Sequence, residues 1–248
     1  MGISKKFSLV IGIVFGSLMI ASPLLMLLNK SPEVDSGIKL TLLSNAGVRI
    51  ESEGVNIYVD PFYIAHTYEF DPADVLCITH PHTDHYVAQS VTALQKEGTI
   101  NIFPESMTDE ISLFNATGVV PEEEIIISDE ITISTYYMYT NEALHARENN
   151  WTSYLIDISG MVFFFGGDSD NITEYQQLSG LVDVAVLNYV PNFLMNNLET
   201  VNAINTIQPQ YVMLVHATFP EYNDFNATYG HLFNATFISL DSYTSYQF

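Results

Sequence analysis

The stretch ITHPHTDHY, residues 78–86, places three of the chain's seven histidines and an aspartate within six positions, directly after an apolar run. In an extended backbone, side chains two residues apart project to the same side, so His80 and His82 can bind one metal ion. Asp84 and His85 lie just beyond, where a helix is expected to begin, and they suit a second ion. A lone histidine is more often an ordinary core or surface residue, but four ligand-type residues this close predict a metal site.

The residue types in this stretch also bear on the metal. Imidazole and carboxylate ligands without a thiolate favour Zn²⁺, with Mn²⁺ or Fe²⁺ as alternatives. The single cysteine, Cys77, lies inside the apolar run that precedes the motif, where a small buried side chain is expected. We therefore predict that Cys77 belongs to the core, not to the metal site.

The surrounding segments predict a mixed β-sheet covered by helices. Short runs rich in Val, Ile, Leu and Tyr between residues 38 and 62 are separated by NAG and EG, which is typical of a β-meander. Residues 74–80 are apolar almost throughout, as in a strand buried on both faces, and residues 84–98 follow with a helical pattern. Strands followed by loops or helices recur between residues 161 and 216. The fold class is α/β (α+β), with the histidines at the carboxyl end of a buried strand.

Composition limits the domain number and the partners. The chain has 248 residues, of which 48% are hydrophobic, which suits one large domain over residues 38–248. Seven Lys and Arg against 29 Asp and Glu give a formal net charge of −22. The negative electrostatic field of a chain with this net charge repels the phosphate backbone of nucleic acids, so we expect no nucleic-acid partner.

The N-terminus has a separate character. Residues 7–28 carry no charge and match the length of about 20 apolar residues that spans a bilayer. We predict a transmembrane helix within residues 1–29, as an anchor or a signal segment, and a linker over residues 30–37. Lys5 and Lys6 precede the apolar run, which places the domain outside the cytoplasm, membrane-anchored or secreted after cleavage. Five N-x-T sequons agree with export.

The motif THPHTDH resembles the H-x-H-x-D-H signature of the metallo-β-lactamase superfamily, and the similarity extends in order from residue 38 to about residue 235. This resemblance implies a four-layer αβ/βα sandwich. Asp60, in IYVDPF, resembles the first landmark of the family. Three later residues match its remaining ligand positions: His145, Asp168 and His216.

The resemblance implies a centre of two divalent metal ions. One ion would be held by His80, His82 and His145. The other would be held by Asp84, His85 and His216, with Asp168 and a hydroxide between the two ions. Two cations make hydroxide available near neutral pH, and Asp84 would be the catalytic residue that orients it and takes up its proton.

The superfamily hydrolyses lactams, lactones, thioesters and phosphodiesters, so the resemblance implies a mechanism more closely than a substrate. The layout is most similar to the lactonase and phospholipase-D-like branch, although Ser44 and Asn45 stand where relatives of ascorbate-phosphate lactonase usually carry Gly-His. Diiron oxygen-reducing relatives usually carry Glu at the position of His82, which favours hydrolysis here. The expected function is hydrolysis of an ester, lactone or phosphodiester. The alternatives are a non-catalytic metal-binding surface module and a nuclease of the same superfamily.

Loop position suggests the substrate contacts. Four residues follow expected strands or lie beside an expected ligand: Tyr63, Arg147, Tyr189 and Asn192. Together with the apolar N-terminus, the aromatic loops suggest a small-molecule or lipid-like substrate near a membrane. The sequence leaves the oligomeric state open.

Overall fold

The computed structural model describes residues 37–64, 71–141, 143–191 and 193–248. The predicted transmembrane segment lies outside these residues, as does all of the predicted linker except Gly37. Within the described part of the chain, no helix combines the length and the apolar character needed to cross a bilayer.

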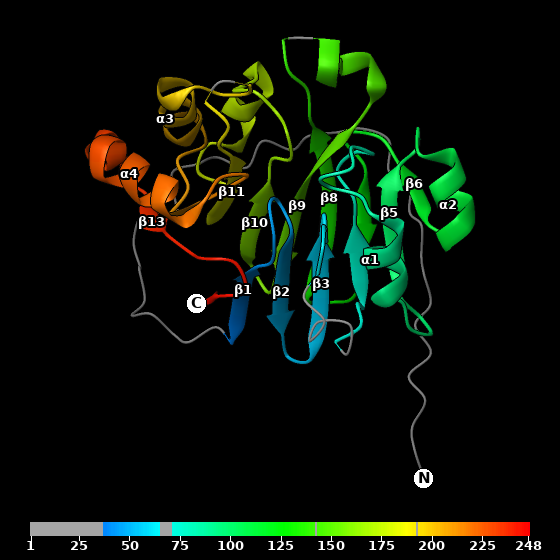
Figure 1. The fold of residues 1–248 in the computed structure, drawn as a ribbon. Helices are drawn as coiled ribbons and strands as arrows, with labels where there is room; N and C mark the ends of the chain where they lie inside the picture. The colour runs from blue at the N-terminus through cyan, green and yellow to red at the C-terminus, as the bar shows by residue number, and fades with distance from the viewer. Residues whose placement is uncertain (1–36, 65–70, 142, 192) are drawn as a thin grey trace.

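Two seven-stranded mixed sheets pack against each other (Figure 1). The first sheet has the order β14-β1-β2-β3-β4-β5-β6. Its strands are β1 (Ile38–Leu42), β2 (Val48–Ser52), β3 (Val55–Val59), β4 (Val75–Cys77), β5 (Ile100–Pro104), β6 (Thr117–Val119) and β14 (Ser245–Gln247). β1, β2 and β3 form the predicted antiparallel meander, and β3 to β6 run parallel.

The second sheet has the order β13-β12-β11-β10-β9-β8-β7. Its strands are β7 (Glu124–Ile126), β8 (Ile131–Tyr137), β9 (Thr152–Ile158), β10 (Met161–Phe165), β11 (Val184–Asn188), β12 (Tyr211–Val215) and β13 (Thr236–Ile238). β7 to β10 pair antiparallel, whereas β10 to β13 pair parallel. The carboxyl ends of β10, β11 and β12 therefore meet at one edge.

Alternating side chains of the first sheet face two different cores. On β3, Ile57 and Val59 join the large cluster between the sheets, while Tyr58 joins a smaller cluster on the outer face. Because successive strand residues point to opposite faces, a continuous apolar run is what such a strand requires. The outer cluster lies beneath α1 (Ala88–Ala93) and α2 (Thr108–Phe114), with Val91 packed into it.

Helices α3 (Asn197–Ile207) and α4 (Phe219–Tyr229) accompany the second sheet, which completes the predicted α/β sandwich (Figure 1). α3 begins at a capping box in which Asn196 and Glu199 satisfy each other's backbone N–H groups. Its buried Val201, Ile204 and Ile207 recur at helical spacing and pack in the large core.

Several short elements differ from the sequence-based prediction. The strand before the histidine motif is only three residues long, and the segment expected to form a helix after β10 forms the 3₁₀ helix η4 (Thr173–Leu178). Two further 3₁₀ turns, η2 (Ala143–His145) and η3 (Arg147–Asn149), lie between β8 and β9, and η5 (Gly230–Leu232) follows α4.

Candidate metal centre

Asp60 fixes the loop that carries the histidine motif. It follows β3 in a left-handed conformation, with φ at 48°, and only 2% of its surface is exposed. Its Oδ1 accepts the backbone N–H of Thr79 at 2.7 Å, and its Oδ2 accepts the Thr79 hydroxyl at 2.6 Å. Oδ2 also lies 2.7 Å from His85 Nδ1. Because a carboxylate only accepts, Nδ1 of His85 must carry the proton, and Nε2 is the nitrogen left for the site.

The first predicted ligand group comes together as three imidazoles. His80 Nε2 and His82 Nδ1 lie 3.1 Å apart, and His80 Nδ1 lies 3.0 Å from the Thr79 hydroxyl. His145 reaches the same place from η2, on the loop between β8 and β9. One nitrogen from each of His80, His82 and His145 falls within 4.8 Å of the others, a cluster that could hold one metal ion.

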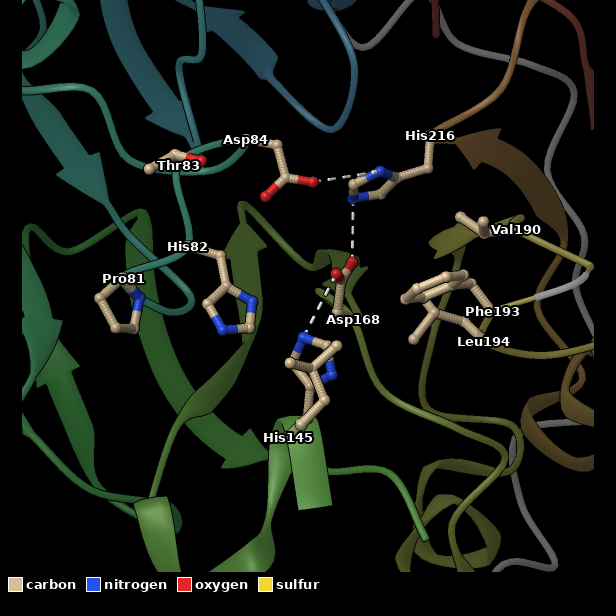
Figure 2. Close-up of a pocket in the computed structure, with 11 residues that line it drawn as sticks. Pro81, His82, Thr83, Asp84, His145, Asp168, Val190, Phe193, Leu194 and His216 are labelled. Atoms are coloured by element: carbon tan, nitrogen blue, oxygen red, sulfur yellow. Dashed lines mark ion pairs between the residues drawn. The ribbon is translucent and has the colours of Figure 1, made fainter. Parts of the chain in front are cut away.

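The second group gathers around His216, which directly follows β12 and has φ at 75°. Its Nε2 lies 2.8 Å from His85 Nε2 and 2.9 Å from Asp168 Oδ1, while its Nδ1 lies 3.9 Å from Asp84 Oδ2 (Figure 2). Asp84, His85, Asp168 and His216 together form a second cluster that could hold an ion.

Asp168 lies between the two groups and directs one oxygen to each. Oδ1 is 3.2 Å from His85 Nε2 and 2.9 Å from His216 Nε2. Oδ2 is 3.4 Å from His145 Nε2 and 3.8 Å from His80 Nε2. The carboxylate is thus placed where the resemblance put a bridging ligand.

The turn before Asp168 depends on glycine. Gly167 has φ at +54°, and a Cβ there would lie 2.6 Å from the sulfur of Met138 and 3.1 Å from Thr79. Asn188, at the end of β11, donates its amide to the carbonyls of Gly167 and Ser169 at 3.0 and 2.7 Å. These contacts hold the Asp168 carboxylate toward the histidines.

The pKa values of the site histidines shift in opposite directions. Burial, reinforced by the neighbouring His85, lowers the pKa of His80 well below its usual range. Burial and the nearby His145 lower the pKa of His82. Burial would also lower the pKa of His85, but the carboxylates of Asp60 and Asp168 outweigh it and raise that pKa to about 10. His80 and His82 are therefore neutral imidazoles near pH 7, the form that ligates metals. At His85 the two carboxylates favour positive charge, which a bound cation would supply in place of the second ring proton.

Asp168 responds to the same charges. Burial would raise its pKa, but the charge of His85 and the close approach of the His145 and His216 rings hold the pKa of this carboxyl well below its usual range. Asp168 is therefore an anion at neutral pH, as a metal ligand must be.

The donor set fits divalent metal ions. Both ring nitrogens of His145 and Oδ1 of Asp168 are buried and make no hydrogen bond, although potential partners lie close by. Groups of this kind are costly to bury unless something satisfies them. Imidazoles facing one another across 2.8 and 3.1 Å leave their lone pairs to a cation, and nitrogen and carboxylate ligands suit Zn²⁺, Mn²⁺ or Fe²⁺.

The two groups open into a cavity of about 490 Å³ (Figure 2). Its described lining includes five of the predicted ligands: His82, Asp84, His145, Asp168 and His216. His80 and His85 are fully buried behind them.

Three of the four predicted substrate contacts can be compared with the cavity lining. Tyr63, Arg147 and Tyr189 are not among the described residues that line this cavity, and Asn192 lies outside the described residues. Tyr189 is buried against Phe225 and donates its hydroxyl to Asn197 at 2.8 Å. The carbonyl of Tyr63 accepts the hydroxyl of Tyr243 at 2.9 Å.

Arg147 forms an ion pair and two cation–π contacts with neighbouring side chains. Its Nη1 lies 2.7 Å from Glu174 Oε1, and its guanidinium stacks over the rings of Tyr137 and Tyr139 at 4.7 and 5.0 Å. Tyr139 in turn donates its hydroxyl to Glu174 at 2.7 Å. This network, two residues beyond His145, ties the loop that carries His145 to η4.

Two residues at the site had no predicted role. Asn45 donates its side-chain amide to the carbonyl of Asp84, and its own carbonyl accepts the N–H of His216, both at 3.2 Å. Trp151 stacks near His80, His82 and His145, with ring centroids 5.1 to 5.7 Å apart. Asn45 was singled out in the sequence only as a departure from Gly-His, and its contacts join segments far apart in the chain.

Comparison with known proteins identifies the class that this fold and site define. Residues 39–216 match the family described as the beta-lactamase superfamily domain. A UPF0173 metal-dependent hydrolase of Anoxybacillus flavithermus is 25% identical, covering 74% of this chain and 88% of the relative. A metallo-hydrolase structure from Ignicoccus hospitalis superposes with a TM-score of 0.73 at 18% identity, covering 85% and 98% of the two chains. An isothiocyanate hydrolase from Delia radicum gut bacteria superposes with a TM-score of 0.67 at 17% sequence identity, covering 85% of this chain and 98% of that chain.

The chain belongs to the beta-lactamase superfamily domain family, since the match extends over more than half of its length. This confirms the predicted superfamily and the predicted enzyme class, a metal-dependent hydrolase.

Proposed function

We propose that this enzyme is a binuclear metallohydrolase that cleaves an ester, lactone or phosphodiester, with His80, His82 and His145 on one ion and Asp84, His85 and His216 on the other. The observation that carries the proposal is the placement of Asp168, whose two oxygens face the two ligand groups separately. A carboxylate that served only one ion would need only one of these contacts.

When bound, two divalent ions supply Lewis-acid polarisation of the scissile group and a water of lowered pKa. The chain supplies the orientation. Asp60 holds the tautomer and direction of His85, and Asp84, which is half-buried, presents its carboxylate to the cavity. In hydrolysis the water oxygen bonds to the carbonyl carbon or phosphorus, and the bond to the leaving oxygen breaks. Asp84 accepts the proton that water loses and returns it to the leaving oxygen.

The test is turnover by the metal-loaded full chain on a panel of carboxylic esters, lactones and phosphodiesters, comparing the natural enzyme with Asp168→Asn. The asparagine keeps the size of the side chain but loses the charge and the second anionic oxygen. We expect kcat to fall by at least about a hundredfold for whichever class is cleaved.

Asp109→Asn is the matched control, because Asp109 is an exposed residue in the first turn of α2, away from the cavity lining. This variant should retain full activity. Full activity in Asp168→Asn as well would contradict the proposed role of Asp168 between the two ions. Metal binding without turnover on every class would contradict the proposed hydrolase and leave the alternative of a metal-binding module without catalysis.

A further inference from the structure

Four large apolar side chains contribute to the lining of the cavity. Leu144, Val190, Phe193 and Leu194 line it, and Figure 2 shows Val190, Phe193 and Leu194 together on the side of Asp168 and His216 away from Pro81. Phe193 is 72% exposed and Leu144 is 51% exposed. Large apolar side chains clustered beside polar groups commonly mark a ligand surface. We call these four residues the apolar wall.

No Lys or Arg is among the described residues that line the same cavity. The chain beyond residue 37 contains four Lys and Arg: Lys39, Arg49, Lys96 and Arg147. None is among the described residues that line the cavity, and each makes an ion pair with a carboxylate: Glu51, Asp71, Asp74 and Glu174, respectively. Arg147, the nearest in sequence to a ligand, also stacks between two tyrosines.

Apart from the metal ions and histidines of the proposed centre, an anionic substrate would thus meet no cationic side chain among the described residues that line the cavity. It would meet the carboxylate of Asp84 at the rim and the field of a chain with a net charge of −22. Enzymes that bind phosphate esters usually supply Arg or Lys to the charged group. An uncharged substrate needs no such partner and can bury hydrocarbon against the apolar wall.

We propose that the cavity binds uncharged carbonyl esters or lactones whose hydrocarbon portion lies on the apolar wall, with Phe193 as a specificity-determining residue. This inference rests on the proposed hydrolase function and narrows its substrate class. Phosphodiesters are correspondingly the poorer substrates.

The first experiment measures kcat/KM of the metal-loaded full chain on p-nitrophenyl acetate, butyrate and octanoate, and on bis(p-nitrophenyl) phosphate, each divided by its uncatalysed rate. Each methylene that the apolar wall shields from water strengthens binding, and an open cavity shields part of the acyl chain. We expect the ratio of kcat/KM to the uncatalysed rate to be at least about tenfold higher for the octanoate ester than for the acetate ester. The same ratio should be lower for the phosphodiester than for every carboxylic ester.

Two variants locate the effect. Phe193→Ala should lower the octanoate-to-acetate ratio of kcat/KM by about threefold or more, because the longer acyl chain loses more contact with the ring than the shorter one. Leu181→Ala is the matched control, since Leu181 is 63% exposed but is not among the cavity-lining residues. Its ratio should equal that of the natural enzyme.

A binding measurement separates recognition from catalysis. Trp151 is the single tryptophan, and its ring packs against those of three site histidines, so its fluorescence reports on this site. Octanamide should bind the metal-loaded protein at least about tenfold more tightly than acetamide, and Phe193→Ala should reduce that preference.

These experiments distinguish failure of the substrate-class inference from failure of the proposed hydrolase function. Preference for the phosphodiester, no dependence on chain length, or an unchanged ratio in Phe193→Ala would overturn the inference and leave the hydrolase standing. Loss of all turnover with metal bound would overturn the proposed function, and the inference with it.

Discussion

Asp60 acts on the site through His85. It receives three hydrogen bonds, from the Thr79 backbone, the Thr79 hydroxyl and His85 Nδ1, at 2.6 to 2.7 Å. Asp60 holds a proton on Nδ1 of His85, so that Nε2 of His85 faces Asp168 and His216. A buried carboxylate behind a ligating histidine orients the ring and increases its basicity. Asp60 is therefore a positioning residue.

Asp60→Asn is expected to lower metal affinity by about 10- to 100-fold, because the amide cannot accept all three donors and turns its own N–H₂ toward one of them. The measurement is a competition titration against a chelator, followed by the fluorescence of Trp151. Asp109→Asn provides the control for loss of one negative charge. Equal affinities in Asp60→Asn and the natural chain would refute this role.

Asn45 joins two segments that each carry a predicted ligand. Its left-handed conformation, with φ at 57°, suits Asn or Gly. Asn45→Gly keeps that conformation and the backbone contact to His216 but removes the side-chain bond to the Asp84 carbonyl. In the same chelator competition titration, we expect the affinity for the second metal equivalent to fall several-fold. The affinity for the first equivalent should change little. An equal loss for both equivalents would show that Asn45 acts through general stability.

At the scale of elements, the loop between β8 and β9 is the segment that brings His145 to the site. It is held by the Arg147–Glu174 ion pair and by the Tyr139 hydroxyl on Glu174. Burial alone would raise the pKa of Glu174, but the hydrogen bond from Tyr139 and the charge of Arg147 outweigh it, and this pKa is lowered.

A carboxyl whose pKa is lower in the folded state contributes stability above its unfolded pKa, near 4.5, and loses that stability as the pH falls through the folded value. Glu174→Gln should therefore be less stable than the natural chain near pH 7, and the difference in unfolding free energy should shrink below about pH 4.5. Urea unfolding of both proteins across this range measures it. A difference independent of pH would contradict the assignment, and Glu124→Gln, on the exposed strand β7, is the control.

The sequence predicted the elements whose signals are local. The meander of β1 to β3 followed from strand patterns and turn residues, and the His80–His85 cluster followed from spacing alone. His145, Asp168 and His216 required the family resemblance, because nothing near them in the chain distinguishes a ligand. The partners of Arg147 and Asn45 could not be predicted, since each contact joins residues brought together only by packing.

At the scale of the whole molecule, the site forms where the two sheets meet. The first sheet supplies the four ligand-type residues that follow β4, and the second supplies His145, Asp168 and His216 from the ends of β8, β10 and β12. Tyr154 of the second sheet donates its hydroxyl to the Ile78 carbonyl of the first at 2.7 Å, beside the motif. Neither sheet alone holds a complete ligand group, so the metal centre and the sandwich depend on each other.

The most direct test is the metal content of the purified full chain, measured by elemental analysis after supplementation with Zn²⁺ or Mn²⁺ and removal of excess. The account predicts about two ions per chain for the natural protein and fewer for Asp168→Ala, since each ligand group loses an oxygen. One ion per chain in both proteins would contradict the bridging role of Asp168, and no bound metal would contradict the assignment of the histidine motif.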